Sequence, residues 1–144
     1  MAPIALAGRC HCGNITVAFE TTTSPERLGL RACQCGFCVR HGARCVTDPA
    51  GRVTFEVRDK GALVRYRFGL GTADFLICGR CGVYLGALLP ADDGARATVN
   101  IDTLDERARF TQPTEPISYE AETEAERIAR RRARWTPAVL RMAG

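Results

Sequence analysis

Seven of the eight cysteines in this 144-residue chain lie in three short clusters whose spacing suits metal binding. The clusters are Cys10-His11-Cys12-Gly13, Cys33-Gln34-Cys35-Gly36-Phe37-Cys38 and Cys78-Gly79-Arg80-Cys81-Gly82. Thiolates two or three residues apart can bind one ion, and the neighbouring glycines let the backbone turn tightly around it. These residues therefore indicate zinc–thiolate chemistry.

The number of ligands divides the clusters into two unlike sites. The two short clusters together offer four thiolates, enough to close a tetrahedral site. These four ligands are Cys10, Cys12, Cys78 and Cys81. The three-cysteine cluster of Cys33, Cys35 and Cys38 fills three positions and leaves a fourth available. We therefore predict two zinc ions per chain, one structural and one reactive.

Other uses of these cysteines fit the sequence less well. A disulfide framework requires an oxidising compartment, but residues 1–8 lack the basic start and the apolar length of a signal peptide, so we expect a cytoplasmic protein. The spacings match neither ferredoxin pattern of iron–sulfur ligation. A thioredoxin-like role for Cys78 and Cys81 would need a βαβ context, whereas the flanking residues predict strands.

Two further residues could complete the three-cysteine site. Cys45 lies in the strand-like run Arg44-Cys45-Val46, where a buried apolar role is the simplest interpretation. His41 follows Cys38 by three residues and could reach the metal or move a proton, although a surface position at a helix end is more common.

The chemistry expected at the three-cysteine site is thiol chemistry. Zinc with three thiolates carries a net charge of −1, so it acidifies water weakly and suits an incoming thiol or a sulfur nucleophile better than hydrolysis. Arginines near the clusters could hold the carboxylates of a small acidic substrate, because the guanidinium fork matches a carboxylate. The candidates are Arg31, Arg40 and Arg44.

The elements that must position these residues are short strands. Apolar residues make up 46% of the chain and charged residues 25%, which is typical of one globular domain, here residues 1–144 with a core over about 4–120. Alternating runs broken by turn residues predict a mostly β fold of antiparallel strands. The expected strands are Ile4–Arg9, Asn14–Glu20, Leu28–Ala32, Ala43–Thr47, Arg52–Val57, Leu63–Phe68, Asp74–Cys78, Val83–Leu88 and Ala95–Ile101. The turn Asp59-Lys60-Gly61 predicts a hairpin between the fifth and sixth of them.

One long helix is expected near the C-terminus, over residues 123–135. Thr123 and Glu126 form a capping box, and Pro137 follows the last turn. On a helical wheel the apolar residues include Ile128 and Trp135, which we expect to face the sheet. The arginines Arg127, Arg131 and Arg134 share another face, which we expect to be solvated.

The order of the motifs resembles that of a known family. The sequence contains Cys-x-Cys-Gly, then Cys-x-Cys-x-x-Cys followed by Arg40 and Gly42-Ala43, then Cys-x-x-Cys-Gly. This pattern is similar to the glutathione-dependent formaldehyde-activating enzyme and centromere protein V family, from Gly8 to about Pro137. Gln34 and Val39 depart from the residues that often occupy those positions in the family.

The resemblance implies a fold, two metal sites and an activity. The fold would be Mss4-like, with zinc-binding hairpins, a structural zinc on the four paired cysteines and a catalytic zinc on Cys33, Cys35 and Cys38. The named enzyme is a carbon–sulfur lyase that adds glutathione to formaldehyde to give S-hydroxymethylglutathione. Its partners would therefore be a small thiol and an aldehyde.

Two other functions are compatible with the residues. A zinc-stabilised binding module could use the arginine run of residues 127–134 on nucleic acid, but Glu120, Glu122, Glu124 and Glu126 precede that run, so nucleic acid is not the expected partner. A zinc–thiolate redox sensor could release its metal when the three-cysteine cluster is oxidised. We find no stretch of the length and apolarity of a membrane span.

Overall fold

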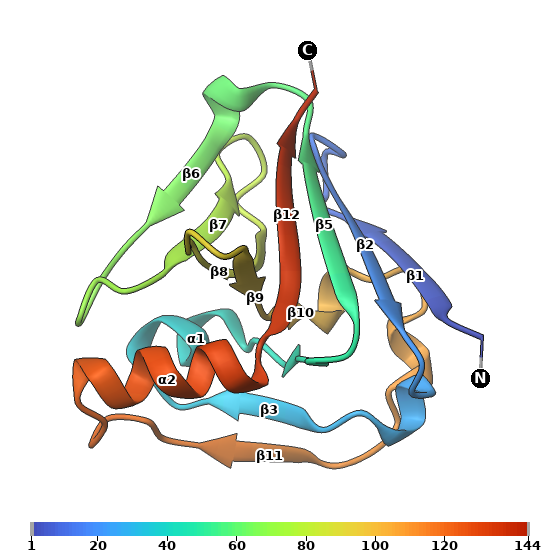
Figure 1. Ribbon diagram of the computed structural model, residues 1–144. Helices are drawn as coiled ribbons and strands as arrows, with labels where there is room; N and C mark the ends of the chain where they lie inside the picture. The colour runs from blue at the N-terminus through green and yellow to red at the C-terminus, as the bar shows by residue number, and fades with distance from the viewer. Residues whose placement is uncertain (1, 144) are drawn as a thin grey trace.

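The computed structural model describes residues 2–143 and consists mainly of β-strands, which confirms the predicted fold class (Figure 1). Met1 and Gly144, the ends of the predicted domain, lie outside the described residues. The larger sheet has eight strands. In spatial order they are β1 (Ile4–Arg9), β2 (Ile15–Thr21), β5 (Arg52–Val57), β12 (Thr136–Met142), β9 (Ala95–Ala97), β8 (Tyr84–Leu89), β7 (Asp74–Cys78) and β6 (Leu63–Tyr66).

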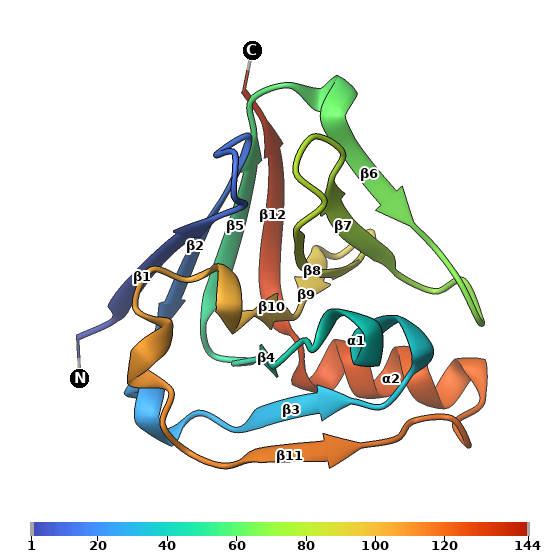
Figure 2. The same ribbon diagram turned by 180° about the vertical axis from the view of Figure 1, so that it is seen from behind.

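A second sheet of four strands crosses one end of the first. Its order is β10 (Val99–Asn100), β4 (Cys45–Val46), β3 (Leu30–Cys33) and β11 (Thr114–Ile117). Helices α1 (Gly36–His41) and α2 (Glu124–Arg134) lie on the side of β3 and β11 that faces the larger sheet (Figures 1 and 2). Neither helix of the described chain has the length and apolar character needed to cross a bilayer.

The core lies where strand faces with alternating apolar residues meet. In β2 every second residue is buried, and in β5 Val53, Phe55 and Val57 are fully buried. All six residues of β8 are buried because this strand is covered on both faces. The alternation in β2 and β5 thus reflects the covering of one face of each strand.

Most pairings are antiparallel, as predicted, but two are parallel. Strand β12 pairs with β5 in parallel, and β11 pairs with β3 in parallel. Neither β11 nor β12 was expected, because each contains a proline, Pro116 and Pro137. Proline is tolerated near the start of a strand and on an edge strand, and β11 is the edge of its sheet.

The predicted hairpin between β5 and β6 is wrong. Strand β5 pairs with β2 and β12, whereas β6 pairs with β7. Residues 58–62 include a short 3-10 turn that begins after Asp59 and carries the chain away from β5. Alternation determines which face of a strand is buried, but it does not specify the neighbouring strand.

The expected strand Ala95–Ile101 is divided between the two sheets. Its first part is β9 in the larger sheet and its second part is β10 in the smaller one. The hydroxyl of Thr98, between them, donates to the carbonyl of Val46 in β4 at 3.3 Å. This crossing connects the two sheets directly and brings β10 against β8, where the side-chain amide of Asn100 donates to the carbonyl of Tyr84 at 2.9 Å.

Helix α2 has the predicted capping box, but one of its arginines faces the protein instead of solvent. The hydroxyl of Thr123 accepts from the amide of Glu126, whose carboxylate accepts from the amide of Thr123. Trp135 is buried, as expected. However, Arg131 is also buried, and the predicted solvated arginine face is wrong for this residue.

Candidate zinc–thiolate active site

The four paired cysteines come together at the tips of two hairpins. Cys10 and Cys12 lie in the turn after β1, and Cys78 and Cys81 lie where β7 turns into β8. Their four sulfurs are all within 4.8 Å of one another. Each turn is followed by a glycine with positive φ, Gly13 at 82° and Gly82 at 79°, a conformation that side chains disfavour.

The sulfur positions of this group fit a tetrahedral metal ion. Sulfurs around zinc with Zn–S bonds of about 2.3 Å lie about 3.8 Å apart. The Sγ atoms of Cys10 and Cys12 are 3.8 Å apart, and those of Cys12 and Cys78 are 3.6 Å apart. Cys10 and Cys78 are fully buried, Cys81 is half-buried and Cys12 is exposed, and the four sulfurs together could fill the coordination of one metal ion.

The three-cysteine cluster is built by the junction between β3 and α1. Cys33 ends β3, Cys35 is the N-cap of α1, and Cys38 is in the first turn. The Sγ of Cys35 accepts from the amide of Cys38 at 3.3 Å, and the three sulfurs are within 4.8 Å of one another. This helix was not predicted. The spacing Cys-x-x-Cys is explained by the helix, because Cys35 caps the first turn, which contains Cys38.

The thiols of this cluster differ in acidity. A hydrogen bond from Cys38 lowers the pKa of Cys33 to about 5 and raises the pKa of Cys38. The cluster therefore readily holds one thiolate at Cys33. Deprotonated cysteine sulfur is the form that binds metal and acts as nucleophile.

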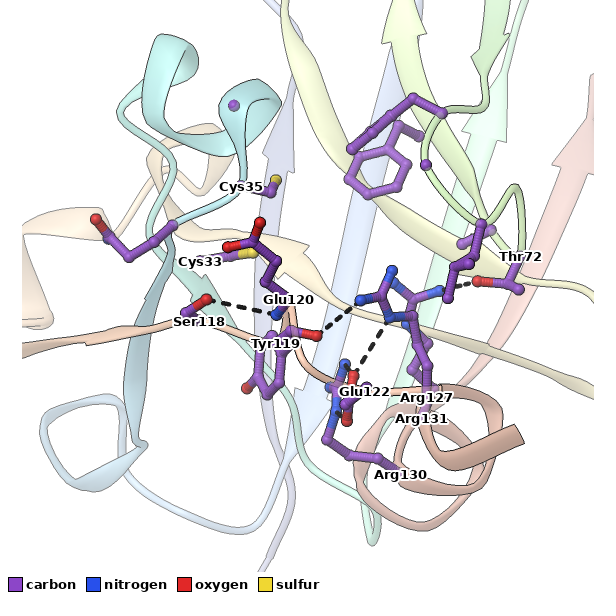
Figure 3. Close-up of a pocket in the computed structure, with 17 residues that line it drawn as sticks. Cys33, Cys35, Thr72, Ser118, Tyr119, Glu120, Glu122, Arg127, Arg130 and Arg131 are labelled. Carbon is purple, nitrogen blue, oxygen red and sulfur yellow. Dashed lines mark hydrogen bonds and ion pairs between the residues drawn. The ribbon is translucent and has the colours of Figure 1, made fainter. Parts of the chain in front are cut away.

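Cys33 and Cys35 open onto a cavity of about 480 Å³. Figure 3 shows the two sulfurs on one side of this cavity and three arginines of α2 on the other, with the side chain of Glu120 between them. Phe68 and Phe75 form an apolar part of the wall, with ring centroids 4.7 Å apart. Such a cavity combines an apolar lining with a few charged groups, which is typical of a small-molecule site.

Neither Cys45 nor His41 joins the cysteine groups within residues 2–143. Cys45 lies in β4, and burial raises the pKa of its thiol to about 12, so it stays protonated. The ring of His41 packs against Phe37, with centroids 4.4 Å apart. Cys45 is therefore a half-buried residue of β4, and His41 is an exposed residue at the end of α1, as the simpler interpretation of each had it.

The three arginines expected to bind substrate lie in different environments. Arg44 forms an ion pair with Asp102 at 2.6 Å, and Arg40 donates to the carbonyl of Gly36 at 3.0 Å. Arg31 lines a smaller cavity of about 70 Å³ that also reaches Cys33. None of the three lines the larger cavity.

Three other arginines line the larger cavity, and these were not identified from the sequence as site residues. They are Arg127, Arg130 and Arg131, at spacings of three and four residues along α2. Arg130 donates to the carboxylate of Glu122 at 2.7 and 3.1 Å and lies 3.6 Å from the ring centroid of Tyr119. The sequence did contain an indication of this role. Helix α2 has few large apolar residues, so some of its arginines must face the protein.

Comparison with known proteins agrees with this geometry. The family model for glutathione-dependent formaldehyde-activating enzyme matches residues 5–121, which include all seven clustered cysteines. A crystal structure of a Rhodobacter sphaeroides protein is 32% identical with a TM-score of 0.53, over 69% of this chain and 87% of that chain. No curated protein gives a significant match. The chain therefore belongs to the glutathione-dependent formaldehyde-activating enzyme family.

Proposed function

We propose that this protein is a zinc-dependent enzyme of the carbon–sulfur lyase type that joins a small thiol, such as glutathione, to formaldehyde. The observation that carries the proposal is the opening of Cys33 and Cys35 onto a charged cavity of about 480 Å³, which no cysteine of the four-cysteine group lines. A reactive group needs access to substrate, and a structural group does not.

The residues of both groups fit zinc. Cys10, Cys12, Cys78 and Cys81 would hold the structural ion, and Cys33, Cys35 and Cys38 would hold the catalytic one. Bound zinc supplies Lewis acidity toward the sulfur of a thiol or the oxygen of an aldehyde. The ion of the four-cysteine group would also stabilise the fold, because it draws together β1 and β7, which are distant in sequence.

The reaction consists of one bond formation and one proton transfer. The sulfur of the thiol attacks the carbonyl carbon, the C–S bond forms as the C=O π bond breaks and its electron pair moves to oxygen, the thiol loses its proton and the carbonyl oxygen gains one. Glu120 lines the cavity beside Cys33 and Cys35 (Figure 3). The other lining carboxylate, Glu122, is engaged by Arg130, so we assign the proton transfer to Glu120.

Exchange spectroscopy by NMR tests this function. Labelled formaldehyde and glutathione are mixed with the zinc-loaded protein, and the exchange rate is compared with the uncatalysed rate. We expect acceleration by the wild type and by Cys45→Ala, and none by Cys35→Ser. The proposal fails if no low-molecular-weight thiol reacts faster with the protein than without it.

A nucleic-acid-binding module is a poorer interpretation of the arginine run. Arg130 is partly buried and paired with Glu122, and Arg131 is buried. Arg132 is exposed and forms an ion pair with Asp93 at 2.7 Å. The run therefore does not form one exposed stripe, which backbone phosphates would require.

A further inference from the structure

Arg131 is a buried cation without an acidic partner. Its residue is 8% exposed, and among residues 2–143 no carboxylate lies within 4.0 Å of its guanidinium. One nitrogen, Nη1, donates to the hydroxyl of Thr72 at 2.7 Å. The Nε atom is buried and has no hydrogen-bond acceptor. Buried charges are normally paired, so the arrangement lacks an anion.

The neighbouring acid does not supply that anion. Glu122 accepts from Arg130 at 2.7 Å and from Arg127 at 3.3 Å, and these two bonds occupy both of its oxygens. Burial, together with the charges of Arg130 and Arg127, lowers the pKa of Arg131 to about 10. The guanidinium is still protonated at neutral pH, and the same neighbours favour a bound anion.

Arg131 is also held in a fixed orientation at the site. Its guanidinium carbon lies 4.7 Å from the ring centroid of Trp135, and the hydroxyl of Thr72 holds its other end. It lines both the larger and the smaller cavity, and Cys33 lines both as well. A group bound to Arg131 would therefore be held in the same space as the thiolate cluster.

We propose that Arg131 binds the carboxylate of the substrate thiol, so that the site selects thiols that carry a carboxylate and discriminates against neutral thiols of equal length. This inference rests on the proposed function for the identity of the substrate as a thiol. An arginine fork matches a carboxylate with two parallel hydrogen bonds, and Arg131 lines the cavity onto which the thiolate cluster opens.

The charges around the cavity favour a monoanion over a phosphate. Three arginines and two glutamates line it, Arg127, Arg130, Arg131, Glu120 and Glu122. Three positive and two negative side chains leave +1 at the arginine side of the cavity, and the zinc–thiolate group, with its charge of −1, lies on the other side. A carboxylate balances this charge, whereas a phosphate dianion would exceed it and lie near the exposed carboxylate of Glu120.

Fluorescence of the one tryptophan in the chain, Trp135, gives a test that does not depend on turnover. The zinc-loaded protein is titrated with 3-mercaptopropionate, with 3-mercaptopropan-1-ol and with 3-(methylthio)propanoate, which keeps the carboxylate but has no free thiol. We expect saturable changes with both carboxylates and at least tenfold weaker binding of the neutral alcohol. Equal binding of the alcohol, or tighter binding of inorganic phosphate than of the carboxylates, would overturn the proposal.

Matched variants test whether Arg131 is the residue that binds the carboxylate. Arg131→Gln should weaken carboxylate binding at least tenfold, whereas Arg134→Gln, an exposed arginine of the same helix, should bind as the wild type does. Arg131→Lys keeps the charge and loses the fork, so it should bind with intermediate affinity. It provides the comparison if Arg131→Gln fails to fold by circular dichroism. Unchanged binding in a folded Arg131 variant would contradict the proposal.

Binding and exchange measured together distinguish a failure of the proposed function from a failure of the Arg131 assignment. If the carboxylates bind through Arg131 but no thiol exchange is accelerated, the anion site stands and the proposed function fails. If exchange is accelerated equally with 3-mercaptopropionate and 3-mercaptopropan-1-ol, the function stands and the role of Arg131 fails.

Discussion

The carboxylate of Glu122 accepts two hydrogen bonds from Arg130, at 2.7 Å from Nε and 3.1 Å from Nη2. The pair joins the segment after β11 to helix α2, and both side chains are mostly buried, at 19% and 15% exposure. The segment and the helix are both walls of the larger cavity. This ion pair therefore holds the cavity together as well as neutralising one of its arginines.

The pair makes stability depend on pH in a defined direction. Hydrogen bonds from Arg130 lower the pKa of Glu122 below its ordinary value of 4.5. The carboxylate thus adds stability above pH 4.5, and this contribution is lost as the pH falls through the folded-state pKa. Glu122→Gln should be less stable than the wild type at pH 7, and the difference should shrink below pH 4.5.

Thermal unfolding of both proteins across this pH range measures the difference. Any loss of metal in acid affects both proteins, so comparison at equal pH removes it. Glu115→Gln, at an exposed position of β11, is the control and should follow the wild type throughout. A difference between wild type and Glu122→Gln that persists unchanged in acid would contradict this role of the ion pair.

The two cysteine groups should respond differently to loss of one ligand. Cys78→Ser opens the closed group, and structural zinc contributes about 10–16 kcal/mol in small peptides, so the variant should unfold or melt far below the wild type. Cys35→Ser should stay folded, because serine also caps a helix and can accept the amide of Cys38.

Metal content and circular dichroism measure both effects. We expect two zinc ions in the wild type and in Cys45→Ala, because Cys45 belongs to neither group within the described chain. Folded Cys35→Ser should lose zinc from the reactive group only. Loss of folding in Cys35→Ser together with a folded Cys78→Ser would reverse the assignment of the structural and reactive groups.

The sequence was sufficient to predict the cysteine groups because metal ligation constrains spacing locally. Cys10 and Cys12 must lie in one turn, and so must Cys78 and Cys81, whichever strands connect them. The strands that carry them were equally predictable, since β1 and β7 have the predicted bounds Ile4–Arg9 and Asp74–Cys78. Local patterns and local chemistry agree in these hairpins.

The cavity could not be predicted in the same way because its walls depend on long-range pairing. Strand β12 joins β5 in parallel, and this pairing draws α2 across the site. Amphipathicity correctly predicted the burial of Trp135 but placed Arg131 in solvent, because a charged face normally lies in water. Arg131 departs from that rule, and departures from local rules are expected at functional sites.

A buried aspartate anchors the loop that forms one wall of the cavity. Asp74 accepts from Arg67 at 2.6 Å, and Arg67 also donates to the carbonyl of Gly71 at 3.1 Å. The loop carries Phe68 and Thr72, which line the cavity. Asp74→Asn should lower the free energy of unfolding by about 1–3 kcal/mol, because it weakens a charged hydrogen bond at a buried position.

The same variant should affect substrate binding more than the chemical step. A loosened loop should raise KM and leave kcat nearly unchanged, which is the pattern of lost uniform binding. Asp93→Asn is the matched control, since Asp93 and Arg132 form an exposed pair that should contribute about 0–1 kcal/mol. A fall in kcat with constant KM would place Asp74 in the chemistry instead of the wall.

Glu120 should control the rate of thiol addition without controlling binding. Positioned acids and bases contribute about 10²–10⁴-fold to proton transfer. Glu120 is exposed to the cavity, so we expect the lower end, a fall in kcat of about 10²-fold in Glu120→Gln. Glutamine keeps the shape of the side chain, so KM should change little.

Steady-state exchange rates with glutathione and formaldehyde measure this effect. Glu120→Asp retains a carboxyl on a shorter side chain and should recover part of the lost rate. The exposed Glu115, on β11, again gives the control variant, Glu115→Gln, with wild-type kcat. If Glu120→Gln and Glu120→Asp reacted at the wild-type rate, the proton would have to move through water in the cavity and not through this carboxyl.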